Sequence, residues 1–132
     1  MASSRKDFEI IKRLGKGSFG VVFKARRRVD GKLYVLKQVN LHGLSTKEQE
    51  ECVREVKLLA SVNHAHIVRY YDSFIEDSSL HIVMELAEKG DLYHKLKADR
   101  AVRRPVCDDE VWRWFLQITM ALQRESSSPS LR

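Results

Sequence analysis

Three features of the sequence together indicate a site for phosphate groups. The glycines Gly15, Gly17 and Gly20 form a G-x-G-x-x-G pattern, and glycine lets a backbone approach phosphates that a Cβ would obstruct. Lys37 follows on a segment whose alternate residues are apolar, where an unpaired ammonium group is costly. Glu55 flanks the apolar stripe of a predicted helix and supplies the opposite charge. Together these residues predict a phosphate site with a Lys–Glu pair.

The elements around the glycines decide between two kinds of site. A dinucleotide-binding fold needs a helix directly after the third glycine. Here Gly20 opens a β-branched and aromatic run, with Val22 two residues after it, so the glycines join two strands. Taken alone, the loop is also compatible with a glycine-rich turn that binds nothing. Lys37 taken alone is compatible with an edge lysine whose stem covers apolar surface.

The hydrophobic pattern predicts an α+β fold, a five-stranded antiparallel sheet with one packed helix. Asp30-Gly31 is typical of a tight hairpin turn. Ser45 and Glu48 match a capping box, which predicts a helix to about Ser61. The apolar stripe of this helix is expected to contain Cys52, Val56, Leu59 and Ala60. The strands are expected at residues 8–14, 20–26, 33–39, 67–74 and 80–86.

Two further helices are predicted near the end of the chain. Asp91 can cap a short helix to about Lys97, and residues 98–107 are expected to be a loop. The helix predicted over residues 108–122 is apolar almost all round, which is typical of a helix inside a larger structure. Its aromatic residues Trp112, Trp114 and Phe115 therefore need a cover, which a protein partner can provide. Residues 1–6 are expected to be a flexible leader, and residues 125–132 a disordered tail.

Composition narrows the class of protein. The 132 residues are 43% hydrophobic, carry a net charge of +6 and include two cysteines. No apolar run approaches the roughly 18 residues of a membrane span, and the cysteines are too few for a disulfide framework. The five histidines have no supporting ligands at metal-site spacing, so no metal site is expected. Arginines cluster at residues 26–28 and at 100, 103 and 104; we interpret them as solvated surface, with a phosphate or partner contact as the alternative.

The motifs resemble those of a protein kinase. FEIIKRLGKGSFG at residues 8–20 is similar to the opening of a eukaryotic protein kinase domain, and YVLK at residues 34–37 stands where V-A-I-K is typical. REVKLL and NHAHIV resemble the helix and loop that follow, although Ala65 and His66 depart from the usual H-P-N-I-V. YYDSF, IVME and GDL are similar to the NIMA-related, Nek-like branch of serine/threonine kinases. The resemblance covers residues 7–123.

The resemblance implies a role for each matching residue. Lys37 would hold the α- and β-phosphates of ATP and pair with Glu55. Met84 resembles the gatekeeper residue, and the hinge would use the carbonyl of Glu85 and the N–H of Ala87 to bind adenine. Leu59 and Tyr70 resemble part of the hydrophobic spine. Leu14, Val22 and Val35 would cover the adenine ring. Asp91 would approach the ribose. The expected ATP-binding residues are Leu14, Gly15, Lys16, Gly17, Ser18, Phe19, Gly20, Val22, Val35, Lys37, Met84, Glu85, Ala87 and Asp91.

The resemblance also implies two lobes, an N-lobe at residues 7–86 and the hinge and first C-lobe helices at residues 87–124. The H-R-D-x-x-x-x-N, D-F-G and A-P-E motifs, which carry the catalytic base and the magnesium ligands, do not occur in the 132 residues. The chain is therefore expected to stop before the catalytic loop and to be inactive alone. Transfer of phosphate from ATP to protein Ser/Thr, with magnesium, would belong to a full-length form. A truncated product, an alternative transcript and an incomplete gene model all remain open.

Two other functions compete with this interpretation. A non-catalytic protein-interaction fragment would use the apolar last helix as its contact surface. A nucleic-acid-binding domain has only the basic pI of about 9.5 in its favour and no recognised motif, so we expect neither nucleic acid nor a membrane as partner. The expected location is the cytoplasm, and the resemblance adds the cytoskeleton, cilium or centrosome.

Overall fold

The computed structural model describes residues 3–16 and 20–126, the last three by their backbone alone. The chain falls into two compact units. The first consists of residues 1–63 with 68–86, and the second of residues 64–67 with 87–132. No helix in the described ranges is long and apolar enough to cross a membrane.

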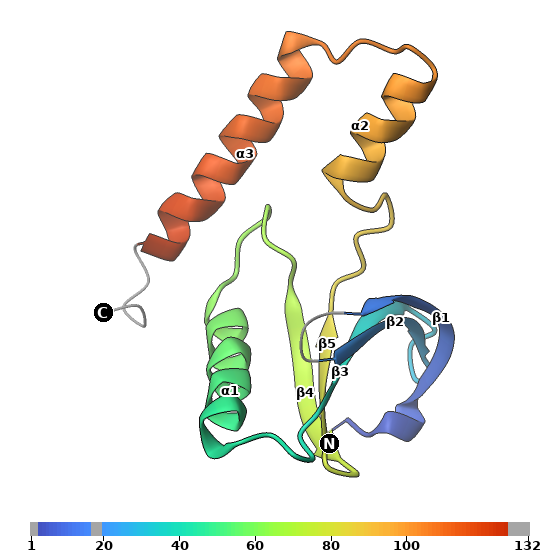
Figure 1. Cartoon of the computed structure of the whole chain (residues 1–132), viewed down its shortest axis with the longest axis vertical. Coiled ribbons are helices and arrows are strands. Elements are labelled where there is room, and N and C mark those ends of the chain that lie inside the picture. Colours follow the sequence, from blue (N-terminus) through green and yellow to red (C-terminus); the bar gives the residue numbers. More distant parts are fainter. Residues whose placement is uncertain (1–2, 17–19, 127–132) are drawn as a thin grey trace. The chain divides into compact units, whose positions relative to one another are not determined.

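The first unit contains the sheet (Figure 1). Its neighbours follow the order β1-β2-β3-β5-β4, and every pair is antiparallel. The predicted five-stranded antiparallel sheet and the α+β class are therefore confirmed. The strands are β1 (Phe8–Lys16), β2 (Gly20–Arg27), β3 (Leu33–Asn40), β4 (Tyr70–Glu76) and β5 (Ser79–Met84).

The two hairpin turns within the described residues differ from each other. β4 and β5 are joined by Asp77 and Ser78, with φ of 50° and 55°, the left-handed conformation that matches the twist of a hairpin. The connection between β2 and β3 is wider than the tight turn predicted at Asp30-Gly31, because Arg27 N–H donates to the Lys32 carbonyl at 2.9 Å. The wider loop lets the Asp30 carboxylate bond Arg27.

Strand β4 begins later than predicted. The N–H of Ile67 donates to the His64 carbonyl at 3.1 Å in a turn, so residues 67–69 do not belong to the strand. β5 starts one residue before its predicted first residue, at Ser79, and ends at Met84. The strand identities were predictable from alternation, whereas these ends depend on turns that alternation does not reveal.

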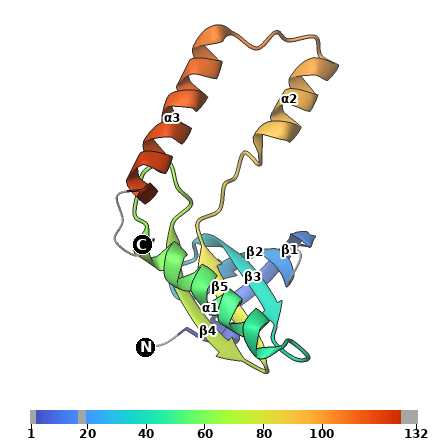
Figure 2. The same cartoon turned by 60° about the vertical axis from the view of Figure 1, so that its left-hand side comes forward.

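Helix α1 (Thr46–Ser61) packs against one face of the sheet (Figure 2). Its capping box is confirmed, because Glu48 N–H donates to the Ser45 hydroxyl and Ser45 N–H to the Glu48 carboxylate. Cys52 is buried, and Val56 and Leu59 pack beside it, as the stripe predicts. Ala60 is exposed, so its place in the stripe was wrong. The buried position instead belongs to Val62, just beyond the end of the helix.

The sheet has an apolar cluster on each face. One cluster contains Phe8, Ala25, Tyr34, Leu36 and Val83. The other contains Val39, Cys52, Leu80 and Ile82, with Leu59, Tyr70 and Met84 packed against it. Because residues alternate along a strand, Lys37 lies on the same face of β3 as Val39, the face that α1 covers.

Part of the segment predicted as a flexible leader contacts the sheet. Arg5–Asp7 form a 3-10 helix (η1) capped by Ser4, and the flexibility of residues 1–6 stays a prediction. The Ser4 hydroxyl and the Arg5 N–H both donate to the Glu76 carboxylate on β4, at 3.0 and 2.8 Å. These bonds join residues about 70 positions apart, which no local pattern signals; residues 1–2 lie outside the described ranges.

The second unit contains α2 (Leu92–Ala101) and α3 (Asp108–Ser126). Asp91 caps α2 by accepting from the His94 N–H at 2.8 Å, as predicted, but the helix continues four residues beyond Lys97 into the predicted loop. α3 likewise passes its predicted end at Leu122 and includes the backbone of 125–126 from the expected tail. Residues 127–132 of that tail lie outside the described ranges.

Candidate nucleotide-binding site

Lys37 lies on an otherwise apolar part of the sheet. Its register partners are Val22 on β2 and Ile82 on β5, and Ile82 is 1% exposed. The Lys37 side chain is only 20% exposed. A partly buried ammonium group needs an ionic or hydrogen-bond partner.

Glu55 provides that partner. Its Oε1 lies 2.5 Å from the Lys37 Nζ. The position of Glu55 follows from α1, whose buried Cys52 fixes which side of the helix faces the sheet. The Glu55 side chain is 45% exposed, and ion pairs so open to water contribute only about 0–1 kcal/mol. The pair therefore does little for stability, but it places the Lys37 ammonium group beside the apolar residues of this face.

Apolar side chains flank Lys37 on the same face. Val35 lies two residues before it on β3 and pairs in register with Met84, while Val22 pairs with Lys37 itself. The register thus brings together four of the residues that the sequence predicts as nucleotide contacts. A small apolar surface with one fixed cation fits a flat heterocycle that carries phosphates.

The glycine motif has two physical roles. A Cβ on Gly20 would lie 2.0 Å from the Gln38 carbonyl oxygen, so this glycine allows β2 to approach β3. A Cβ on Gly15 would meet nothing within 4 Å, so the space beside it is open. Leu14 and Lys16 on β1 are exposed. The predicted contacts Gly17, Ser18 and Phe19 lie outside the described residues.

The predicted hinge begins at the end of β5. Glu85 N–H donates to the Arg69 carbonyl at 2.8 Å, and the Arg69 N–H donates to the Glu85 carboxylate at 3.0 Å. This reciprocal clasp, which the sequence did not signal, fixes the backbone of Glu85. The predicted contacts Ala87 and Asp91 belong to the second unit. There the carboxylate of Asp91 caps α2, and its hydrogen bond from the His94 N–H lowers the Asp91 pKa.

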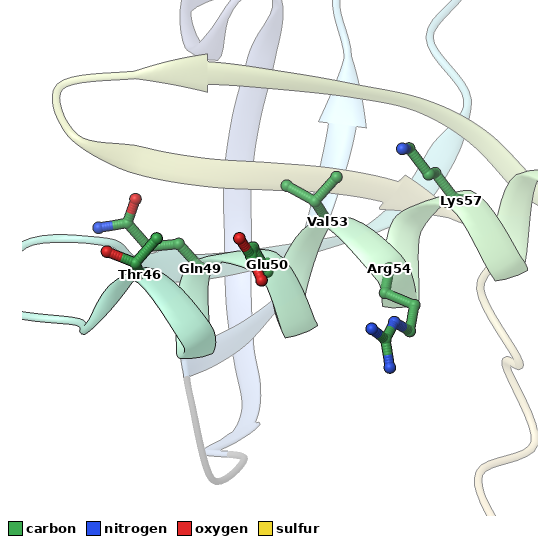
Figure 3. A pocket seen from close by; sticks show the side chains of 6 residues that line it. All are labelled: Thr46, Gln49, Glu50, Val53, Arg54 and Lys57. Carbon is green, nitrogen blue, oxygen red and sulfur yellow. The ribbon is translucent and has the colours of Figure 1, made fainter.

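Two hollows lie beside α1, away from Lys37. One is an apolar groove of about 480 Å³ between α1 and β4, lined by Val53, Val56 and Phe74 among others. The other, about 510 Å³, runs along α1 itself. Figure 3 shows Val53 and Lys57 on the side of α1 next to the β4–β5 hairpin, and Arg54 pointing away from it. Neither hollow is lined by a predicted nucleotide contact.

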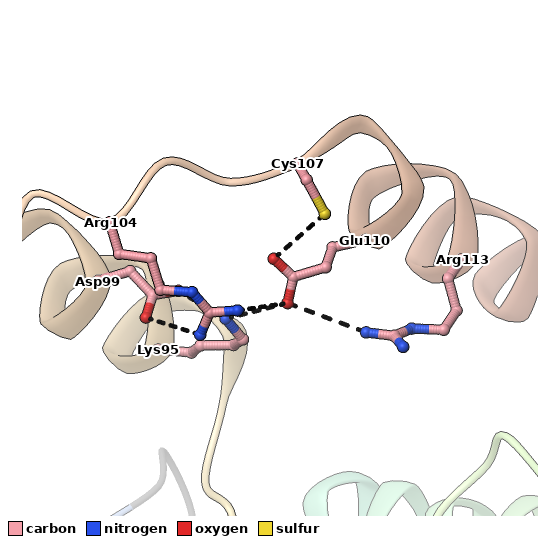
Figure 4. Close-up of polar contacts among 6 residues, drawn as sticks. All are labelled: Lys95, Asp99, Arg104, Cys107, Glu110 and Arg113. Atoms are coloured by element: carbon pink, nitrogen blue, oxygen red, sulfur yellow. Dashed lines mark hydrogen bonds and ion pairs between the residues drawn. The ribbon is translucent and has the colours of Figure 1, made fainter.

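A polar cluster joins the helices of the second unit (Figure 4). Glu110, at the start of α3, lies 3.5 Å from Lys95, 3.6 Å from Arg104 and 3.9 Å from Arg113. Asp99 pairs with Lys95 at 2.5 Å and with Arg104 at 3.7 Å, and the Lys95 bond lowers the Asp99 pKa. Every charge here has a partner, so the cluster fixes the α2–α3 connection. Within the described ranges, no group of three His, Cys, Asp or Glu could hold a metal ion.

The family model for the protein kinase domain matches residues 8–124. The chain belongs to the protein kinase family. Within this family it is 41% identical over 120 residues to a probable serine/threonine-protein kinase, nek3 of Dictyostelium discoideum. It is 39% identical over 113 residues to the serine/threonine-protein kinase Nek1 of Mus musculus, and 37% identical over 125 residues to Nek2 of Homo sapiens.

These matches span most of this kinase chain but little of each relative. They cover 91%, 86% and 93% of the chain, against 11%, 9% and 28% of nek3, Nek1 and Nek2 respectively. The chain therefore spans less than a third of the length of these relatives. The similarity therefore concerns the kinase domain region of these relatives.

Proposed function

We propose that this chain is the ATP-binding part of a Nek-like protein serine/threonine kinase. The observation that carries the proposal is the Lys37–Glu55 pair on the same sheet face as Val22, Val35 and Met84. In a kinase this pair is part of the machinery for phosphoryl transfer. The proposed reaction of a full-length form transfers the γ-phosphoryl group of ATP to a Ser or Thr hydroxyl of a protein substrate.

The residues have separate proposed roles. Lys37 contacts the α- and β-phosphates, and Glu55 keeps its ammonium group in position. The open side of Gly15 leaves room for the phosphates. The carbonyl of Glu85 and the N–H of Ala87 bind the edge of adenine. The motifs for the magnesium ligands and the catalytic base do not occur in the 132 residues, so we assign those groups to further residues of a full-length form.

A nucleotide-binding measurement tests this proposal without requiring phosphoryl transfer. The affinity for a fluorescent ATP analogue is measured for the chain, for Lys37→Ala and for the control Lys47→Ala on the exposed side of α1. A charged hydrogen bond is worth about 1.5–3 kcal/mol, so Lys37→Ala should weaken binding by about tenfold or more. Equal affinities for the Lys37→Ala and Lys47→Ala variants would refute the proposed site.

A second candidate function is a non-catalytic protein-interaction fragment. Within the described ranges, α3 exposes Trp112 by 61% and Phe115 by 56%, and such apolar surface is typical of a contact site. Trp114 is less exposed and lies under Lys95, at 5.4 Å from its Nζ. Capture of one specific partner that is lost in Trp112→Ala, together with no ATP binding, would favour this candidate.

The location stays a prediction. Cytoplasmic residence, with a cytoskeletal, ciliary or centrosomal association, is proposed from the similarity to the Nek kinases. Imaging of the tagged chain in cells tests it, and residence in another compartment would remove it.

A further inference from the structure

The positive charge of the chain is concentrated in one short segment. Residues 12–28 contain seven Lys or Arg and no Asp or Glu. The rest of the chain is nearly balanced, because it holds 17 of the 24 basic residues and all 18 acidic ones. The segment spans most of the β1–β2 hairpin. A local excess of one charge creates a field that attracts anions.

Three of these cations lie on one face of the hairpin. Lys12 and Lys24 are direct partners in the β1–β2 register, which places their Cβ atoms about 5 Å apart on the same side. Arg26 follows Lys24 by two residues, so it points the same way. We call these three residues the basic triad. Lys12 and Arg26 are exposed, and Lys24 is half-buried.

Among the described residues, no carboxylate forms an ion pair with a side chain of the basic triad. No hydrogen bond or ion pair joins its side chains to another group in the described ranges, although Glu9 stands opposite Arg26 in the register. The neighbouring Arg27 differs, because the Asp30 carboxylate neutralises it. Like charges directly opposite each other destabilise a sheet, so the Lys12–Lys24 pair has a cost that a bound anion would relieve.

From this arrangement we infer that the basic triad is a docking site for an extended acidic polypeptide segment. Alternate side chains of an extended chain are spaced by about 6.6 Å, which is also the spacing from Lys24 to Arg26. One carboxylate can therefore lie between Lys12 and Lys24 while the next accepts the guanidinium fork of Arg26.

The neighbouring side chains favour a polypeptide over nucleic acid. The face continues with Val22, Leu33 and Val35, which are register or alternation neighbours of Lys24 and Arg26. None is aromatic, whereas single-stranded nucleic acid is bound by stacking its bases on aromatic rings. Small apolar residues beside cations instead suit a peptide that alternates acidic and apolar or small side chains. Val22 and Val35 are also proposed adenine contacts, so the docking site adjoins the proposed nucleotide site, and the peptide is titrated without nucleotide.

A peptide titration tests the docking site. The anisotropy of a dye-labelled peptide of alternating Glu and Ser is followed as the chain is added, with a Gln–Ser peptide as the neutral comparison. The variant Lys12→Gln/Lys24→Gln/Arg26→Gln should weaken binding by about tenfold or more, since each lost pair contributes a few-fold. The control Lys47→Gln/Arg54→Gln/Lys57→Gln removes the same charge from exposed positions of α1 and should weaken it by about twofold or less.

A single reversal guards against a variant that fails to fold. Lys24→Glu places a carboxylate opposite Lys12, so this variant should melt at the same temperature as the parent chain or at a higher one. The same carboxylate should repel the Glu–Ser peptide. Equal weakening by the triad and α1 variants, or equal binding of the Gln–Ser peptide, would overturn the inference. So would binding of single-stranded DNA or anionic vesicles through the triad without binding of the acidic peptide.

Discussion

The glycine motif offers the sharpest test of the structure, because two of its glycines should respond in opposite ways to the same substitution. In Gly20→Ala the new Cβ would lie 2.0 Å from the Gln38 carbonyl oxygen and 2.9 Å from its carbon. Both are backbone atoms, so no side-chain rotation relieves the clash. In Gly15→Ala the new Cβ meets nothing within 4 Å.

The cost of Gly20→Ala follows from what must move. Overpacking costs about 1–3 kcal/mol, and separating Gly20 from its partner Val39 weakens one backbone hydrogen bond, worth about 1 kcal/mol. The more restricted unfolded chain returns about 0.4–1 kcal/mol. The net loss is about 2–3 kcal/mol of the free energy of unfolding, a large share of a typical total of about 5–15 kcal/mol. Gly15→Ala should change it by about 0.5 kcal/mol or less.

Urea unfolding followed by circular dichroism measures both variants. The midpoint should fall for Gly20→Ala and stay in place for Gly15→Ala, with an unchanged slope. ATP-analogue affinity is the second readout: Gly15→Ala should weaken it at unchanged stability if phosphates occupy the open side of Gly15. The steric argument fails if Gly20→Ala unfolds at the parent midpoint, or if both variants lose the same stability.

Two further variants probe the sheet. The hydrogen bonds from the Arg5 N–H and the Ser4 hydroxyl lower the pKa of Glu76. This carboxylate therefore stabilises the fold above its unfolded pKa, and the stabilisation is lost as the pH falls through its folded pKa. The Glu76→Gln variant should melt at a lower temperature than the parent chain at pH 7, and thermal melts down to about pH 3 should show this difference shrinking. Ser78→Gly should raise the unfolding free energy by about 0.5–1 kcal/mol, because Ser78 has φ of 55° and glycine adopts that conformation without strain; an unchanged or lower urea midpoint would contradict this.

The capping box and the strand alternation of this kinase chain were predictable because both depend on residues close together in the sequence. The capping box of α1 needs only Ser45 and Glu48, three residues apart, and the structure contains both of its hydrogen bonds. The alternation of β3 likewise placed Val35 and Lys37 on one face before any partner strand was known. These features depend on neighbours in the sequence, so the sequence is enough to infer them.

Several of the features that sequence reasoning missed involve residues far apart in the sequence. Ser4 is held by Glu76, 72 positions away, and the Arg69–Glu85 clasp spans 16. Helix α2 also ends later than predicted, at Ala101. The polar contacts of its last turn include the pair of Asp99 with Arg104 from the following loop. A composition-based boundary cannot anticipate such contacts.

The glycines show why a correct motif can rest on an incomplete reason. The sequence assigned all of them to one purpose, the approach of backbone to phosphate. In the structure Gly20 is required by the carbonyl of Gln38 on the next strand, whereas Gly15 has open space where its Cβ would be. The motif thus combines a folding requirement with a binding requirement. A loss of ATP affinity in Gly20→Ala would follow from misplacement of Val22 and Lys37 on paired strands, and only Gly15→Ala separates contact with phosphate from the integrity of the sheet.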